Sequence, residues 1–383
     1  MNPKARVRAL AAPFLLIAAW SALVTGACAA SASSRRPTPA AATAAAPAAL
    51  PPIAGTRVEP LPGERHFRNI RQMTTGGTYA EAYFAPDGKK IILQAKRVGD
   101  AADQIYSLDP ATGQLTRLSN GKGKTTCSFY LPDGRFTYAS THLKGDAPPP
   151  EPDRSKGYAW PLSREYDIFL GDPKTGSLKQ LTDNDGYDAE ATPSPDGKRL
   201  VYTSHRADGM WLYTMNVDGT DPLRVSRRKG YIGGPVFSPD GKWILSRAWY
   251  PRNPEEDRKL EEMFAERVLR PTGMDIEIYM SRLDGSDERP LTSGGKINFA
   301  PAFFPEGKRI IFASNMSAKA PGQYGLYVEK TDATGLEQVS FHEGFDGFPC
   351  FSPDGRRLAW ISNRNAVGDP RRDLNVFIAD WVE

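Results

Sequence analysis

The residues that could do chemistry are few, and they do not form a known catalytic motif. The sequence has four histidines, but no His-Glu-x-x-His pattern and no cysteine pairs at zinc-binding spacing. It also lacks the Gly-x-Ser-x-Gly elbow of serine hydrolases. The segment Gly121–Thr125 is not a phosphate-binding P-loop, because Leu118 stands where that loop needs its first glycine. We therefore expect no catalytic residue and no cofactor.

Four acidic residues are better candidates, for binding rather than catalysis. Glu81 and Glu190 share one position, counted back from a Pro-Asp-Gly phrase that recurs along the chain, and Asp188 and Asp346 lie two residues before that position. Alternate residues of a strand point to the same face, so we predict that all four converge as an acidic mouth on a central channel. Such a mouth suits a divalent cation such as Ca²⁺, or a cationic peptide. The alternative, that these carboxylates bind backbone N–H groups or water, stays open.

The phrase that positions these residues occurs six times, at Phe84–Gly88, Tyr130–Gly134, Pro193–Gly197, Phe237–Gly241, Phe303–Gly307 and Phe351–Gly355. Asp-Gly between two runs of β-forming residues is a strong hairpin signal. Each unit continues with a third strand that has an aromatic centre. Where a fourth strand follows, it ends in Leu or Val before Ser or Thr. Four antiparallel strands make one propeller blade, so the sequence predicts an all-β, six-bladed β-propeller.

The two ends of the repeat region complement each other. The sixth unit stops after its third strand, at Ile378–Glu383, whereas a fourth-strand phrase, Arg68–Thr74, stands alone before the first unit. We predict that this N-terminal strand supplies the outer strand of the last blade and closes the ring, which removes an open sheet edge.

Two blades carry insertions, near residues 144–163 and 251–273. The first is rich in proline and predicts a rigid, non-helical loop. In the second, Leu260, Met263, Phe264, Val268 and Leu269 recur at helical spacing, and Asn253 can cap the helix. Insertions on the rim of repeat proteins often mark a binding face; a helix that only fills a surface groove is the open alternative.

The N-terminal region predicts export. Lys4, Arg6 and Arg8 precede an apolar run, so we assign residues 1–29 to a signal peptide. Either ordinary cleavage follows Ala29, or Cys28 is the lipidated cysteine of a lipoprotein. Residues 30–63, rich in Ala and Pro, predict a disordered tether, and residues 64–383 the propeller. After the leader, only Cys127 and Cys350 remain. Because they fall in blades that are not adjacent, we expect two buried free thiols.

The repeat resembles that of the TolB-like exported propellers, and in particular the C-terminal propeller of TolB. The resemblance covers about residues 65–383 and includes Tyr187–Ala191, Phe345–Pro349 and Asn375–Trp381. It implies a non-catalytic scaffold, a monomer in the periplasm or at the outer membrane, which binds envelope proteins or peptides. The leader supplies most of the formal net charge of +4, so we expect no nucleic-acid partner, and membrane contact only through the lipid anchor. The alternatives are a hydrolase or metal-dependent lyase sited in the channel, or an accessory subunit of an exported peptidase.

Overall fold

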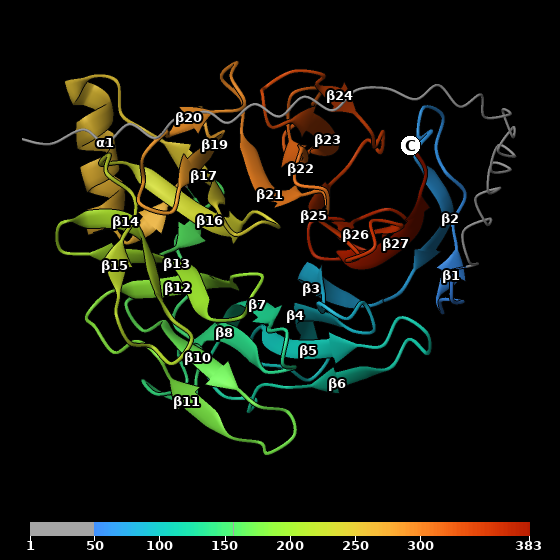
Figure 1. Ribbon diagram of the computed structural model, residues 1–383, viewed down its shortest axis with the longest axis horizontal. Helices are drawn as coiled ribbons and strands as arrows, with labels where there is room; N and C mark the ends of the chain where they lie inside the picture. The colour runs from blue at the N-terminus through green and yellow to red at the C-terminus, as the bar shows by residue number, and fades with distance from the viewer. Residues whose placement is uncertain (1–49, 156) are drawn as a thin grey trace, which may run out of the picture. The chain divides into compact units, whose positions relative to one another are not determined.

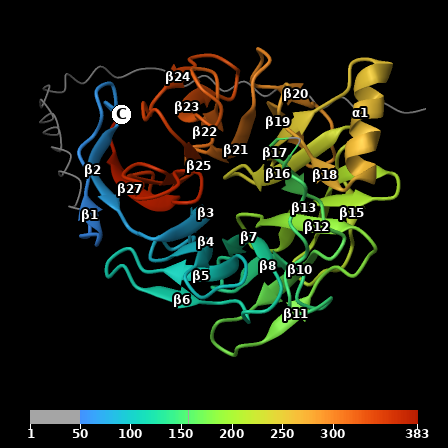
Figure 2. The same cartoon turned by 180° about the vertical axis from the view of Figure 1, so that it is seen from behind.

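The computed structural model describes residues 50–155 and 157–383, and these residues form six antiparallel sheets arranged around a central axis (Figures 1 and 2). Each inner strand contacts the inner strands of both neighbouring sheets, so the sheets form a complete ring. The prediction of an all-β, six-bladed propeller is confirmed.

The first five sheets each run in chain order from the inner to the outer edge. The first three sheets contain β3 (Gly77–Phe84), β4 (Ile91–Arg97), β5 (Gln104–Leu108) and β6 (Leu115–Arg117); β7 (Thr125–Tyr130), β8 (Phe136–Ser140), β10 (Asp167–Gly171) and β11 (Leu178–Gln180); and β12 (Tyr187–Pro193), β13 (Arg199–Arg206), β14 (Gly209–Asn216) and β15 (Leu223–Arg224). The next two contain β16 (Tyr231–Phe237), β17 (Trp243–Trp249), β19 (Glu277–Arg282) and β20 (Arg289–Pro290); and β21 (Asn298–Phe303), β22 (Arg309–Ser314), β23 (Gly325–Lys330) and β24 (Glu337–Gln338).

The sixth sheet takes its outer strands from the N-terminal side of the propeller. Its order is β25 (Asp346–Phe351), β26 (Arg357–Ser362), β27 (Asn375–Trp381), β2 (Phe67–Gln72) and β1 (Thr56–Arg57). The strand β2 pairs antiparallel with β27, as Figure 1 shows near the C-terminus. Phe67 of β2 is fully buried, with its ring centroid 5.1 Å from that of Trp360. The N-terminal segment is therefore part of the core of this sheet.

The Ser or Thr that follows each fourth strand, two residues after its end, has the same role in every sheet. Its hydroxyl oxygen accepts a hydrogen bond from a backbone N–H of the third strand, at 2.8–3.0 Å. The six pairs are Ser119 with Ile105, Thr182 with Ile168, Ser226 with Leu212, Thr292 with Ile278, Ser340 with Leu326, and Thr74 with Val376. A buried N–H needs such a partner. Thr74, at the end of the N-terminal phrase, fills the same role in the sixth sheet as the other five do in theirs.

The folded region begins earlier than the predicted boundary at residue 64. The strand β1 pairs with β2, and the backbone N–H of Ala54 donates to the carbonyl oxygen of Pro110. Residues 51–63, which the composition assigned to the tether, thus belong to the propeller. The predicted signal peptide, Cys28 and the rest of the tether up to residue 49 lie outside the described residues.

The two insertions meet each other. The second forms α1 (Pro254–Ala265), capped by Asn253 as predicted, with Leu260 and Met263 buried. Val268 and Leu269, which the spacing assigned to that helix, instead form β18 (Val268–Leu269). This strand pairs with β9 (Trp160–Pro161) of the first insertion. The helix ends because Arg267 adopts a left-handed backbone, with φ +55°. No helix among the described residues is long and apolar enough to cross a membrane.

Candidate functional site

A left-handed residue interrupts every inner strand. The six residues at the position of Glu81 have φ between +50° and +60° and sit at a β-bulge; they are Glu81, Cys127, Glu190, Gly234, Ala300 and Phe348. A bulge of this kind re-aims the side chain of the extra residue. The strict alternation on which the predicted acidic mouth relied therefore fails at this position.

As a result, the two predicted rows of residues have different surroundings. Five of the six bulge residues are partly exposed, whereas the row two residues earlier is entirely buried, at 0–2% exposure; it comprises Tyr79, Thr125, Asp188, Ile232, Asn298 and Asp346. The structure brings Glu81 and Glu190 into one cluster. It places Asp188 and Asp346 in two other networks, so the four carboxylates do not converge.

Glu190 is held by an ion pair with Arg247 of the neighbouring sheet. Its Oε2 also accepts hydrogen bonds from the N–H of Gly234 and the hydroxyl of Thr203, both at 2.7 Å. Arg247 Nε donates to the hydroxyl of Tyr231 at 2.6 Å. Burial alone would raise the pKa of Glu190, but Arg247 and these donors keep it below its ordinary value. Glu190 is thus an ionised carboxylate, and both of its oxygens accept hydrogen bonds.

Glu81 has few partners. Its Oε1 lies 3.4 Å from the thiol of Cys127, and its Oε2 is buried without a hydrogen-bond partner. Burial, and next the charge of Glu190, raise the pKa of Glu81 to about 7. Cys127 is buried and Cys350 half-buried, and both are free thiols. Around neutral pH, Glu81 therefore changes between a hydrogen-bond donor and an acceptor.

The first insertion brings aromatic side chains over this cluster. The ring of Trp160, on β9, lies 5.4 Å from the guanidinium of Arg247. Tyr158 is 55% exposed, with its ring 6.2 Å from that of Trp160. Burial, with a contribution from the charge of Tyr158, raises the pKa of Tyr324 to about 12. Tyr324 is in turn in ring contact with Phe299 and Phe345, at 5.2 and 5.8 Å.

Asp346 belongs to a buried charged network at the edge of the sixth sheet. Arg364 donates to Asp346 and to Glu64, each at 2.9 Å, and Trp360 Nε1 donates to Asp346 at 3.2 Å. Burial opposes ionisation of Asp346, but Arg364 holds its pKa below the ordinary value. These contacts tie the segment before β2 to β25, so Asp346 has a structural role.

Asp188 lies between the second and third sheets. The amide of Asn184 donates to its Oδ2, whereas its Oδ1 has no hydrogen-bond partner. The nearby Asp167, 3% exposed, accepts from Gln180 at 3.1 Å and from Thr182 at 3.3 Å. Burial raises the pKa of both carboxyls. For Asp167 the charge of Asp188 adds to this effect, and its pKa reaches about 6.

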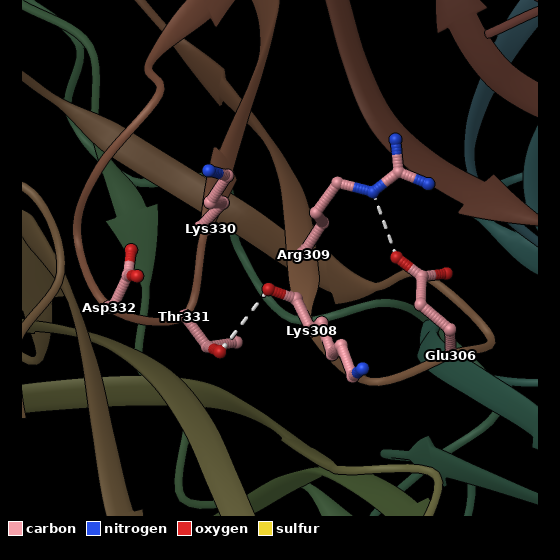
Figure 3. Close-up of a pocket in the computed structure, with 6 residues that line it drawn as sticks. All are labelled: Glu306, Lys308, Arg309, Lys330, Thr331 and Asp332. Carbon is pink, nitrogen blue, oxygen red and sulfur yellow. Dashed lines mark hydrogen bonds and ion pairs between the residues drawn. The ribbon is translucent and has the colours of Figure 1, made fainter.

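Two other features, a buried histidine and a surface hollow, are weaker candidates for a functional site. His205 packs on Phe264 of α1 at 4.4 Å, and burial lowers its pKa to about 4. A hollow of about 480 Å³, on the side of the Pro-Asp-Gly turns, is lined by Glu306, Lys308, Arg309, Lys330, Thr331 and Asp332. Figure 3 shows Arg309 paired with Glu306 there. Within residues 50–155 and 157–383, no group of three or more His, Cys, Asp or Glu is placed to hold a metal.

No family model matches the chain. It is 26% identical over 179 residues to an uncharacterized protein of Agrobacterium fabrum, covering 44% of this chain and 54% of that protein. It is also 26% identical over 165 residues to the uncharacterized peptidase YuxL of Bacillus subtilis, covering 39% and 25%. With the Tol-Pal system protein TolB of Francisella tularensis the identity is 26% over 173 residues, covering 45% and 35%. The matches thus span about half or less of these relatives.

Among solved structures, TolB of Acinetobacter baumannii has a TM-score of 0.51 at 17% identity, covering 80% of this chain and 64% of that one. The chain folds as a TolB-like propeller. Its fold is shared by an oligogalacturonate lyase in complex with manganese (TM-score 0.52, 13% identity, covering 87% and 97%). It is also shared by a gluconolactonase of Xanthomonas campestris (0.53, 13%, covering 89% and 99%). Because a lyase and a gluconolactonase share this fold with TolB, a TolB-like propeller does not by itself define an activity.

Proposed function

We propose that this TolB-like propeller is an exported, non-catalytic scaffold that binds proteins or peptides of the cell envelope. The sequence match to TolB supports this proposal, as does the signal-peptide pattern of residues 1–29. Under this proposal the chain acts as a monomer in the periplasm or at the outer membrane. There Cys28, if lipidated, is its membrane anchor.

One observation carries the proposal: aromatic side chains gather on the side of the propeller that carries both insertions. Tyr158 is more than half exposed, its ring lies 6.2 Å from that of Trp160, and its phenol contributes to the raised pKa of Tyr324. Aromatic residues and arginine are enriched in protein interfaces, because they offer a large contact area with little conformational entropy to lose. We refer to Tyr158, Trp160 and Tyr324 as the aromatic mouth. Its partner would insert apolar or aromatic side chains there.

Site-specific crosslinking tests this surface. Tyr158 is replaced by p-benzoylphenylalanine, and Leu223 serves as the control position, because it is 53% exposed but lies on the outer strand β15. Irradiation of whole cells should give a defined adduct with an envelope protein at position 158 only. Equal labelling at both positions, or none at position 158, would contradict the proposal. Fractionation of the same cells, with and without Cys28→Ala, tests export and lipidation.

A second function, catalysis in the channel, is favoured by the opposite pKa shifts of two coupled carboxyls. The pKa of Glu81 is raised to about 7 and that of Glu190 is lowered. Such a pair is typical of a general acid beside an ionised carboxylate. Turnover of a peptide or uronate polymer that disappears in Glu81→Gln would support this function. No turnover by the wild-type protein would favour the scaffold.

A further inference from the structure

Equivalent residue pairs meet at five interfaces between neighbouring sheets. In each, the backbone N–H of an inner-strand residue donates, at 2.9–3.1 Å, to a carbonyl oxygen of the neighbouring sheet. The residue that carries this carbonyl directly precedes the first residue of a third strand, and that first residue is the partner in the pair. The pairs of third-strand and inner-strand residues are Gln104 and Thr125, Asp167 and Asp188, Glu277 and Asn298, Gly325 and Asp346, and Asn375 and Tyr79. Of these five, only Asp167 and Asp188 are both carboxylates.

At two of the other interfaces, a donor meets the carboxylate. Asn298 donates its side-chain amide to Glu277 at 2.8 Å. Asp346, whose counterpart Gly325 has no side chain, receives the guanidinium of Arg364 at 2.9 Å. A buried carboxylate needs hydrogen bonds and a paired charge to offset its desolvation, and these two interfaces supply an amide donor and a cation respectively.

In the pair of Asp167 and Asp188, the amides of Gln180 and Asn184 donate to the two carboxylates, but among the described residues neither carboxylate forms an ion pair with a cation. Arg206 occupies the place in β13 that Arg364 occupies after β26, but it donates to Ser204 at 2.9 Å and lies over the ring of Tyr213. Asp188 is fully buried, and its Oδ1 has no hydrogen-bond partner. The Oδ1 of Asn184 is also buried without a partner. Burial raises the pKa of Asp188, and the charge of Arg206 opposes this shift without forming an ion pair with Asp188. Two carboxylates and an amide oxygen therefore gather where no cation is in direct contact with either carboxylate.

We propose that a calcium ion binds between the second and third sheets, held by the carboxylates of Asp167 and Asp188 and the side-chain oxygens of Asn184 and Thr182. All four donors are oxygens, the ligands that Ca²⁺ prefers, and water completes its coordination. The site is separate from the aromatic mouth and does not depend on the proposed function. Its ion would join the second sheet to the loop that leads into the third.

The test measures Ca²⁺ binding directly, by calorimetry and by thermal unfolding of chelator-treated protein at pH 7.5. Wild-type protein should release or absorb heat on titration with CaCl₂, and its unfolding midpoint should rise until the site is saturated. Asp188→Asn reproduces the pairing of Glu277 with Asn298. It should therefore fold, lose the Ca²⁺ response and melt above metal-free wild type. Asp185→Asn, at a neighbouring side chain that is 79% exposed, should keep the response.

Two results would overturn the proposal. One is a wild-type protein that shows neither heat nor a midpoint shift with millimolar Ca²⁺ and gains stability only on acidification, because the pair then shares a proton. The other is an Asp188→Asn protein whose Ca²⁺ response equals that of wild type, because the ion would then bind elsewhere.

Discussion

The ion pair of Glu190 and Arg247 allows a quantitative test of how much a buried charge pair contributes to the stability of the propeller. Their side chains are only 12% and 14% exposed. Removing one partner of a buried pair leaves the other charge desolvated, which costs about 3–5 kcal/mol. For Arg247→Met we expect the lower end, about 3 kcal/mol, because Glu190 keeps its bonds to Gly234 and Thr203. The double variant Glu190→Gln/Arg247→Met retains neither charge of this pair, so its loss of stability should be smaller than the sum of the losses in the single variants.

Urea unfolding of the wild type, both single variants and the double variant gives the coupling free energy, expected at about 1–3 kcal/mol. The dependence on pH has a definite sign. Without Arg247, burial raises the pKa of Glu190 in the folded state, so Arg247→Met should lose stability as pH rises. Arg282→Met is the matched control, because Arg282 also lies over a tryptophan but is 42% exposed; it should cost less than about 1 kcal/mol. An Arg247→Met protein as stable as this control, at every pH, would refute the reasoning.

Three further predictions concern stability. Glu329 is 6% exposed, and burial raises its pKa to about 7; the fold therefore loses stability as pH rises from the ordinary glutamate value through 7. Glu329→Gln should add up to about 3 kcal/mol at pH 8 and little at pH 4, whereas Glu262→Gln on the exposed face of α1 should do neither, as urea unfolding at both pH values will show. Ala300→Gly should stabilise by up to about 1 kcal/mol, because a left-handed backbone is strained for alanine; chemical denaturation checks this. Thr74→Val should cost about 1–3 kcal/mol and speed hydrogen exchange at Val376, the N–H that Thr74 accepts.

The fold could be predicted because each repeat contains residues that specify a turn through local hydrogen bonds and backbone conformation. Ser238-Pro-Asp-Gly241 shows why: the hydroxyl of Ser238 accepts from the N–H of Trp243 at 3.0 Å, and Asp240 accepts from that of Lys242 at 3.1 Å. Gly241 has φ +68°, which only glycine adopts without strain. Ser238, Asp240 and Gly241 thus each have a local reason to occur in the phrase. Thr74 could be recognised in the same way, because it has the position that a Ser or Thr occupies after the fourth strand of each other sheet.

The site could not be predicted in the same way, because its geometry depends on a bulge that has no consistent residue signature. Of the six left-handed positions only Gly234 is a glycine, so five offered no sign that the alternation would break. The pairing of β9 with β18 is non-local and only two residues long. Arg267, which lies between α1 and β18, is not a residue type that commonly ends a helix. These features arise from tertiary contacts rather than local preference.

The distribution of charge in the channel determines which partner the aromatic mouth should prefer. Of the four acids predicted to converge, Glu190 is paired with Arg247, Asp346 shares Arg364 with Glu64, burial raises the pKa of Asp188, and Glu81 titrates near neutral pH. Because these carboxyls are paired with arginine or have a raised pKa, they exert little attraction on a cationic peptide over a distance. A partner recognised by aromatic contacts should instead bind with an affinity that changes little between low and physiological salt, because screening acts on exposed charges and not on buried apolar area. Titration of the crosslinked partner, once identified, at two salt concentrations will measure this. A steep loss of affinity with salt would show that charges outside this cluster dominate recognition.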